Sequence, residues 1–354
     1  MKRIYNYLKK DAVLTISWVL AIVSMFFIKP DKAYAGYIDW RSLGILWSLM
    51  IITKGYMQNG IFEKIGHALL TRTRKMWQLI AVLVGLNFFS SMIITNDVSL
   101  ITFVPFAIMM LKQCGRQELM IPVVVLQTIA ANLGSMLTPI GNPQNLYLYG
   151  LAGTGIGEFI MWLLPYTIAS ALLLVISILL IKNKNEIICI EDTDSEAAHN
   201  TSVPRVMAYS VLFILALLVV ARVLTWYILA AAVLITVLLL EKNVLAKADY
   251  ALLLTFIGFF IFTGNMGRVE SVAHFLAGIV KGRELEAGII TSQCISNVPA
   301  ALLLSEFTDN IKNLAIGVNI GGLGTLIASM ASLISYKLYA NDCLLYTSDA
   351  ADEL

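Results

Sequence analysis

The chain has 354 residues, of which 58% are apolar and only 14% are charged. Soluble domains average roughly 45–50% apolar and about 25% charged residues, so the composition excludes an ordinary soluble protein. The formal net charge of +2, with no long basic run, argues against nucleic acid as a partner. Four scattered cysteines and three scattered histidines, without a CxxC pair, support neither a disulfide framework nor a zinc site.

The apolar residues are grouped in long blocks. Residues 12–28 and 159–181 approach the ~20 residues that a helix needs to cross a bilayer core, so we predict an all-α polytopic membrane protein. The basic start MKRIYNYLKKD precedes the first block. We interpret residues 1–36 as an uncleaved N-terminal transmembrane helix with a cytoplasmic N-terminus. A cleaved leader is the alternative, because KAYAG follows the block.

A polar tip is predicted next, after a helix over 39–54 and an amphipathic interfacial helix within 59–75. The stretch SMIITNDVSLITFVPF places Thr95, Asn96 and Asp97 inside a hydrophobic run. Basic residues flank the run on both sides, which favours the cytoplasmic face for both ends. These features predict a re-entrant hairpin with residues 95–97 at its tip.

A broken helix follows the hairpin, in the stretch ANLGSMLTPIGNPQN. Pro139 and Gly141 interrupt the helix that ends near Leu137, and Asn142 followed by Pro143 is typical of a new helix start. The span over 159–181 closes this half of the chain.

The second half repeats this order. Residues 182–205 are the most polar stretch and predict a linker, although a plain long loop is the alternative. Helices are predicted over 207–222, 224–240 and 249–264, with an amphipathic stretch over 267–284. The motif SNVP at 296–299 precedes the glycine-rich VNIGGLGTLIASMAS at 318–332. Corresponding breaks in two halves indicate a transporter built from repeats.

The two predicted hairpins differ in their flanking charges. Mixed and acidic residues surround SNVP, which suits the outer face of the membrane. We therefore predict an inverted repeat with two re-entrant hairpins and discontinuous helices, the first repeat over 37–181 and the second over 206–340. The last residues, 341–354, contain CLLYTSDAADE, which resembles a translated sequencing adaptor. We expect the natural sequence to end near Asn341 with a final helix missing; a genuine polar tail is the alternative.

The helix starts at these breaks predict a shared binding site. Unpaired N–H groups at a helix start attract an anion, and freed carbonyl, amide and hydroxyl oxygens suit Na⁺. The candidate substrate- and ion-binding residues are Thr95, Asn96, Asp97, Asn132, Gly134, Ser135, Thr138, Gly141, Asn142, Ser296, Asn297, Asn319, Gly321, Gly322 and Thr325. A Na⁺ site is expected near Thr95, Asn96, Asp97, Ser296 and Asn297. We expect no catalytic residues and no cofactor besides Na⁺ or H⁺ as coupling ion.

Asp97 has two interpretations. An intramembrane carboxylate is by default a cation ligand or proton carrier. Alternatively, the polar residues at both tips only cap broken helices. The functional reading is favoured because Val298 occupies the matching position in the second half.

The stretches ITNDVSLITFVPF, ANLGSMLTPIGNPQNLYLY, SNVPAALLLSEF and IGGLGTLIASMASLISYK resemble the ion transporter superfamily. This group contains citrate and dicarboxylate/sodium symporters, arsenite permeases and some sodium/proton antiporters. The resemblance implies an elevator-type carrier, usually a homodimer. The asparagines and leading hydroxyls of the symporters' Ser-Asn-Thr tips carry over, whereas the threonines do not. The Asn-Asp pair is closer to arsenite permeases, which leaves the substrate open.

The leading function is a secondary transporter of a small anion, either a carboxylate or an inorganic oxyanion, in the cytoplasmic membrane. The alternatives within transport are arsenite or oxyanion efflux and Na⁺/H⁺ exchange. ATP-driven transport by this chain is disfavoured because no GxxxxGK[ST] loop occurs, and an enzyme because no HExxH or GxSxG motif occurs. A channel or a membrane scaffold remains a further class.

Overall fold

A computed structural model describes residues 12–70, 73–181, 186 and 202–352. All regular elements of these residues are helical. The first half holds α2 (Ala12–Phe27), α3 (Tyr34–Tyr37), α4 (Trp40–Gln58), α5 (Ile61–Leu70), α6 (Met76–Ser90), α7 (Asn96–Gln113), η1 (Gln117–Leu119), α8 (Met120–Ser135), α9 (Pro143–Ala152) and α10 (Ile156–Leu180). The second half holds α11 (Val203–Val220), α12 (Trp226–Leu240), η2 (Lys242–Lys247), α13 (Tyr250–Arg268), α14 (Glu270–Val280), α15 (Glu284–Ile295), α16 (Asn297–Ser305), α17 (Ile311–Gly321) and α18 (Met330–Asp352).

The prediction of an all-helical membrane protein is confirmed. Among the described residues, four helices are long and apolar enough to cross a membrane: Gln117–Ser135, Ile156–Leu180, Val203–Val220 and Tyr250–Arg268. Large apolar side chains such as Phe26, Leu180 and Leu239 are exposed on the surface of the chain. Exposed apolar surface of this extent is matched to lipid, because a soluble monomer rarely presents it to water.

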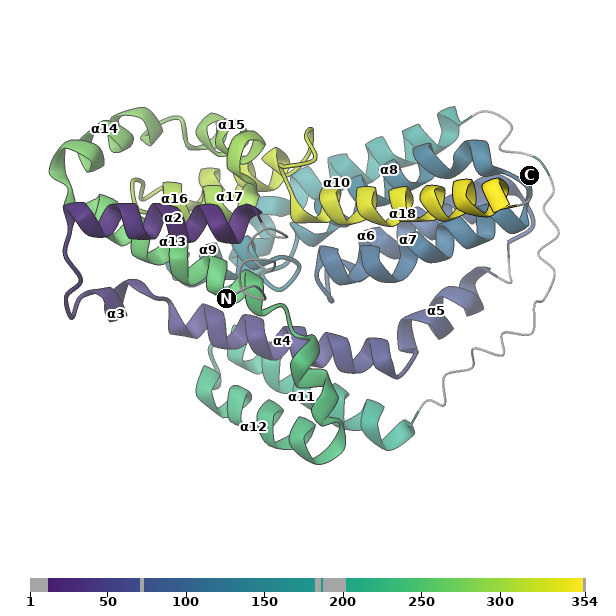
Figure 1. Cartoon of the computed structure of the whole chain (residues 1–354), viewed down its shortest axis with the longest axis horizontal. Helices are drawn as coiled ribbons and strands as arrows, with labels where there is room; N and C mark the ends of the chain where they lie inside the picture. Colours follow the sequence, from purple (N-terminus) through teal and green to yellow (C-terminus); the bar gives the residue numbers. More distant parts are fainter. Residues whose placement is uncertain (1–11, 71–72, 182–185, 187–201, 353–354) are drawn as a thin grey trace.

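The helices form three groups that are visible in Figure 1. Helices α6, α7, α8, α10 and α18 lie together at one end, and α2 with α13 to α17 lies at the other. Helix α4 packs with α11 and α12 below them. One buried apolar cluster runs through α6, α7, α8 and α10, and a larger one joins α4, α9, α11, α12, α13, α16 and α17. The chain therefore places elements of both halves in one helical bundle.

Both predicted hairpins are pairs of packed helices joined at a tight turn. Helices α6 and α7 form the first pair, and α15 and α16 form the second. The broken helices also form as expected: α8 stops at Ser135, and α9 starts at Pro143 with Asn142 as its cap. In the second half α17 stops at Gly321, and α18 starts at Met330. The first segments of the broken helices, α8 and α17, each pack against both arms of the hairpin of their own half. The second segments contact the hairpin of the other half: α9 packs on α16, and α18 packs on α7.

Two glycines allow the broken helices to approach the hairpins closely. A Cβ at Gly134 of α8 would lie 2.1 Å from the Phe88 carbonyl oxygen of α6. A Cβ at Gly321 of α17 would lie 2.8 Å from the Cα of Ile289 on α15. Small residues are what membrane helices use to bring backbones together. Gly134 and Gly321 therefore fix how deep each broken helix sits against its hairpin.

The domain boundaries remain predictions. The linker at 182–205 lies outside the described residues apart from Glu186 and 202–205, and α11 already begins at Val203. Residues 1–11 of the predicted N-terminal segment also lie outside them. The residues interpreted as a non-native tail continue α18 to Asp352.

The packing at Gly134 gives the first prediction. Gly134→Ala should lower the free energy of unfolding by about 1–3 kcal/mol, because the added methyl group collides with backbone that cannot move aside. The matched control is Gly85→Ala on α6, where a Cβ meets nothing within 4 Å. Thermal unfolding of both variants in detergent measures the difference. Equal melting temperatures would contradict the close packing of α6 and α8.

Candidate functional site

The two hairpin tips share an unusual backbone conformation. Thr95 has φ 64° and ψ 147°, and Ser296 has φ 78° and ψ 154°. Among the described residues other than glycine, positive φ occurs only at these two positions and at Arg222. A non-glycine residue in this region is strained, and such strain persists only where the surroundings enforce it. The same strained residue thus precedes the start of α7 and the start of α16.

The capping interpretation is wrong for the side chains of Thr95 and Ser296. Both occupy the cap position, but neither side chain accepts a hydrogen bond from its helix. The Ser296 hydroxyl instead points to Asn297 Oδ1 at 3.4 Å. Asp97 is not a cap either, since it lies in the first turn of α7. The Thr95 and Ser296 side chains therefore do not cap their helices, whereas Asp97 in the first turn of α7 can still offset the partial positive charge of the helix start.

Each tip is tied to the broken helix of its own half. The backbone N–H of Asn96 donates to the Gly141 carbonyl at 3.1 Å, and that of Asn297 donates to the Ala328 carbonyl at 2.9 Å. Gly141 and Ala328 occupy matching places, each just before the second segment of its broken helix. One unpaired N–H of each helix start is satisfied by a carbonyl that the helix break has released.

The two broken helices bind one another through a reciprocal pair of hydrogen bonds. Ser329 Oγ donates to Asn132 Oδ1 at 2.9 Å, and Asn142 Nδ2 donates to Asn319 Oδ1 at 3.0 Å. Asn132 and Asn319 both lie two residues before the close-packed glycines, and Asn142 and Ser329 both precede the second helical segment. In each half, the residue before the second helical segment therefore donates a hydrogen bond to the matching asparagine of the other half.

Further hydrogen bonds extend this pair into a buried network. Asn96 Nδ2 donates to Asn132 Oδ1 at 3.1 Å, and Asn319 Nδ2 donates to Asn145 Oδ1 at 2.6 Å. We call the connected side chains the asparagine centre; they are Asn96, Asn132, Asn142, Asn145, Asn319 and Ser329. All six are at most 5% exposed. Hydrogen-bonded amides in an apolar interior fix one arrangement, because an unpaired alternative loses about 1–3 kcal/mol per group.

The second tip lies against the break between α17 and α18. A Cβ at Gly322 would lie 2.8 Å from Asn297 Nδ2, so a larger residue at this position would displace the Asn297 amide. Gln293 of α15 donates through Nε2 to the carbonyls of Gly321 and Leu323, at 2.6 Å each. These bonds satisfy backbone oxygens that the end of α17 would otherwise leave unpaired in an apolar medium.

The first break is held in a comparable way by other residues. Thr138 Oγ1 donates to the Met92 carbonyl of the first tip at 2.5 Å, and Asn142 Nδ2 donates to Ser135 Oγ at 3.2 Å. A Cβ at Gly141 would lie 2.1 Å from the Ser135 carbonyl oxygen. The predicted residues of this break therefore pack tightly beside the first tip.

Two polar atoms of this region point to an interaction beyond the protein's own. Asp97 Oδ1 and Asn132 Nδ2 are buried and have no hydrogen-bond partner among the described residues. The backbone N–H of Asp97, in contrast, already donates to Asn96 Oδ1 at 3.0 Å. A buried carboxylate oxygen and a buried amide N–H offer one acceptor and one donor at the first tip.

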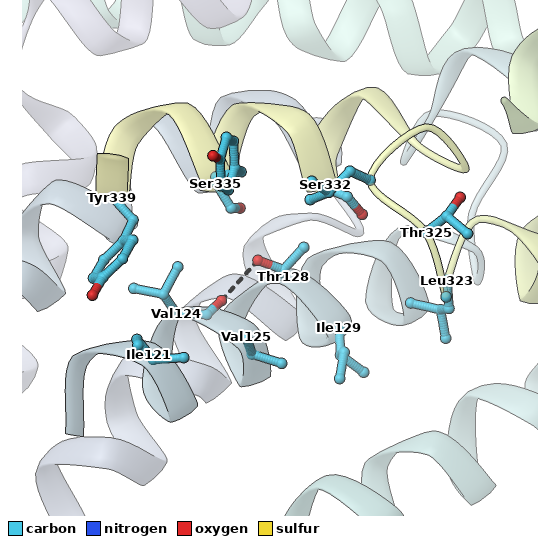
Figure 2. Close-up of a pocket in the computed structure, with 13 residues that line it drawn as sticks. Ile121, Val124, Val125, Thr128, Ile129, Leu323, Thr325, Ser332, Ser335 and Tyr339 are labelled. Carbon is cyan, nitrogen blue, oxygen red and sulfur yellow. Dashed lines mark hydrogen bonds between the residues drawn. The ribbon is translucent and has the colours of Figure 1, made fainter. Parts of the chain in front are cut away.

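Thr325 lies apart from the asparagine centre. Its side chain is exposed, receives a hydrogen bond from the Ala328 N–H at 3.1 Å, and lines a pocket of about 570 Å³ between α8 and α18. Figure 2 shows Thr325 at one end of this pocket, with Ile121, Val124 and Val125 of α8 along its floor. The pocket is mainly apolar, so Thr325 does not share the polar surroundings of the other candidate residues.

Sequence reasoning missed four residues of this region: Lys54, Asn145, Gln293 and Ser329. Asn145 and Ser329 are members of the asparagine centre, and Gln293 binds the second break. Aligning the two breaks residue by residue would have found Ser329, since it stands opposite Asn142. A lysine within the apolar run LMIITKGYM was the signal for Lys54.

The fold and the site are those of a polytopic membrane protein with a polar centre between two broken helices. A family model described as citrate transporter matches residues 8–329, so the chain belongs to the citrate transporter family. The resemblance to the ion transporter superfamily is thereby confirmed. The protein is a membrane transporter and not an enzyme.

Named relatives agree with this assignment. An uncharacterized transporter of Methanocaldococcus jannaschii is 32% identical, over 92% of this chain and 88% of its own length. The inner membrane protein YbiR of Escherichia coli is 30% identical, over 92% of this chain and 87% of its own length. The silicon efflux transporter LSI3 of Oryza sativa is 31% identical over a shorter stretch, 40% of this chain and 29% of its own length.

The reciprocal hydrogen bonds give the second prediction. Asn319→Ala should lower the free energy of unfolding by about 1–3 kcal/mol, because it removes the acceptor of one Asn142 hydrogen bond and the donor to Asn145 Oδ1. Asn313→Ala, a change of the same chemistry on the same helix, is the control. Thermal unfolding in detergent compares the two variants. A smaller loss for Asn319→Ala than for Asn313→Ala would contradict the network.

Proposed function

We propose that this protein is a secondary active transporter that carries a small anion, a carboxylate or an inorganic oxyanion, and couples its movement to Na⁺ or H⁺. The observation that carries the proposal is the reciprocal pair of hydrogen bonds, Ser329 to Asn132 and Asn142 to Asn319. This pair connects the two broken helices, to which both hairpin tips are attached. A single transport site requires one polar centre to which both halves of the chain contribute side chains.

An inverted repeat is part of the proposal. Supporting it, Asp39 caps α4 and Asp249 caps α13 in the same manner, through the N–H of Ser42 and of Leu252. Strained tips, tip-to-break hydrogen bonds and close-packed glycines also correspond between the halves. The basic flanks of the first hairpin and the mixed flanks of the second favour entry from opposite faces of the membrane, with a cytoplasmic N-terminus.

The chemistry of the centre suits an anion together with a cation. Helices α7, α9 and α16 all begin close to the asparagine centre, and helix starts carry partial positive charge that stabilises a negative solute. The oxygens of Thr95, Asp97 and Ser296 are hard ligands of the kind that Na⁺ prefers. Glycines at both breaks permit close approach of backbone to a ligand. The candidate residues named from the sequence remain our proposal for the site, with Thr325 at its edge.

We further propose an elevator mechanism in a homodimer, which the superfamily resemblance implies. In this scheme both hairpins and both broken helices move together, since they are bound to one another through the asparagine centre. Helices α4, α11 and α12 pack together beneath them, in one apolar cluster with α9, α16 and α17, and are our proposal for the static scaffold.

Oxyanion efflux is the second candidate function. The Asn-Asp pair at the first tip favours it, and so does the likeness to a protein named as a silicon efflux transporter. Proteoliposomes distinguish the directions: uptake of an anion that depends on an inward Na⁺ gradient excludes an efflux antiporter. Saturable flux with counterflow excludes a channel.

The third prediction concerns Asp97. In proteoliposomes loaded with the purified chain, uptake of citrate, succinate, silicate or arsenite is measured under an inward Na⁺ or H⁺ gradient. Asp97→Asn should reduce gradient-driven uptake at least about tenfold, because the amide removes the charge that binds the cation. Lys312→Gln, which changes an exposed residue of α17 outside the proposed site, should keep wild-type uptake. Unchanged coupling in Asp97→Asn would contradict the proposed role.

Ligand binding provides an independent readout of the same proposal. An anion that binds only the folded protein stabilises it by about 2.7 kcal/mol at a hundredfold excess over Kd. We expect one anion of the panel to raise the melting temperature. The increase should be larger in Na⁺ than in K⁺ if Na⁺ is the coupling ion, and should depend on pH if H⁺ is the coupling ion. No stabilisation by any carboxylate or oxyanion would argue against an anion as the substrate.

A further inference from the structure

Charge is distributed unequally between the two otherwise matching halves. Thr53 and Thr263 occupy the same place on α4 and α13, and each hydroxyl donates to the two carbonyls three and four residues before it. The next residue is Lys54 in the first half but Gly264 in the second. The first half also has Asp97 where the second has Val298. The first half therefore carries a cation and an anion at two positions that are uncharged in the second half.

Lys54 lies beside the first hairpin tip. It is half-buried near the end of α4, and its ammonium approaches Met57 Sδ at 3.8 Å. Its neighbours Tyr56 and Met57 pack in one apolar cluster with Ile94 and Val98, the residues that bracket the tip. The end of α4 thus reaches from the proposed scaffold to the turn that carries Asp97.

Lys54 is the main counter-charge of Asp97. Among the described residues, the charged groups that interact with Asp97 are Lys54 and Asp249 at the start of α13, and Lys54 also interacts with Asp249 and Lys247. Asp249 and Lys247 are both exposed, so water and salt screen their charges. The half-buried Lys54 ammonium therefore remains as the partner of Asp97, whose Oδ1 is buried without a hydrogen bond. That oxygen is available to a cation that takes the place of the ammonium.

The second half cannot hold the same pair. A Cβ at Gly264 would lie 2.4 Å from Tyr37 Cγ, so the Tyr37 ring fills the place that a lysine would need. The difference in charge between the two halves therefore follows from how residues 54 and 264 are packed. Only the first tip combines a carboxylate with a basic side chain from another helix.

We propose that Lys54 is a tethered counter-ion of Asp97, and that Na⁺ displaces it when the coupling cation binds at the first tip. This inference rests on the proposed cation-coupled transport and adds a residue to its mechanism. While the site holds no Na⁺, the Lys54 ammonium neutralises Asp97; like charges repel, so Na⁺ binding moves the ammonium away. Lys54 thereby weakens Na⁺ binding enough for release. Because Lys54 is on α4 and Asp97 on the hairpin, the pair also links the two groups of helices.

A double-mutant cycle tests the pair itself. The melting temperatures of Lys54→Gln, Asp97→Asn and the double variant are compared with wild type in Na⁺-free detergent solution. Lys54→Gln should destabilise the wild-type protein but have less than half that effect in the Asp97→Asn background, where no charge is left to neutralise. Lys54→Arg, which keeps the charge, should restore most of the loss. Additive effects would overturn the pairing.

A Na⁺ titration tests the displacement. The Na⁺ concentration at half-maximal thermal stabilisation should fall at least about tenfold in Lys54→Gln, because removing a cation at such a site strengthens cation binding. Lys54→Arg should stay near wild type, and so should Lys312→Gln, which removes a charge from an exposed residue of α17. An unchanged midpoint in Lys54→Gln overturns the proposal.

The outcomes also separate this inference from the proposed function. If Na⁺ drives uptake but Lys54→Gln leaves the Na⁺ midpoint unchanged, the counter-ion role fails and the transport function stands. If Na⁺ stabilises none of the variants, displacement by Na⁺ is overturned, whereas proton-driven uptake in proteoliposomes decides the function on its own.

Discussion

Backbone that leaves a helix inside an apolar medium must find hydrogen-bond partners, and this constraint governs the whole molecule. Water is not available there, and each unsatisfied N–H or C=O group is costly by several kcal/mol. The chain breaks two helices and turns two hairpins within its apolar core. These irregular segments instead form hydrogen bonds with one another. The backbone N–H groups of the hairpin tips donate to carbonyls at the helix breaks, and the two breaks are joined by the hydrogen bonds of Ser329 with Asn132 and of Asn142 with Asn319.

The same constraint explains the strain at the tips. Thr95 and Ser296 adopt positive φ, which is unfavourable for residues with a Cβ. The conformation aims the next N–H at the broken helix instead of at the tip's own side chains, and the resulting hydrogen bond offsets part of the strain. Glycine would remove the strain but also the hydroxyl oxygen. The presence of Thr and Ser at these two positions fits a need for that oxygen in the proposed cation site.

Much of the fold could be predicted from the sequence, because hydrophobic blocks and helix-breaking residues are local signals. The predicted helix at 39–54 is α4 at 40–58, and Asn142 and Pro143 begin α9 as expected. The partners within the site could not be predicted in the same way. Asn145 joins the asparagine centre only because α9 and α17, far apart in the chain, lie together, and Ser329 only because the start of α18 lies beside α8. Lys54 likewise comes within electrostatic range of Asp97 only because the end of α4 packs against the first tip.

The claim on which the rest depends is that the two broken helices touch at a common polar centre. Cysteine cross-linking across that contact tests it most directly, with the native cysteines replaced and Asn132→Cys combined with Ser329→Cys in membranes. A short bifunctional thiol reagent should join this pair efficiently, and should not join the control pair of Asn132→Cys with Asn313→Cys to the same extent. If the first pair stays unlinked while both thiols react singly, the halves do not meet there and no shared site exists.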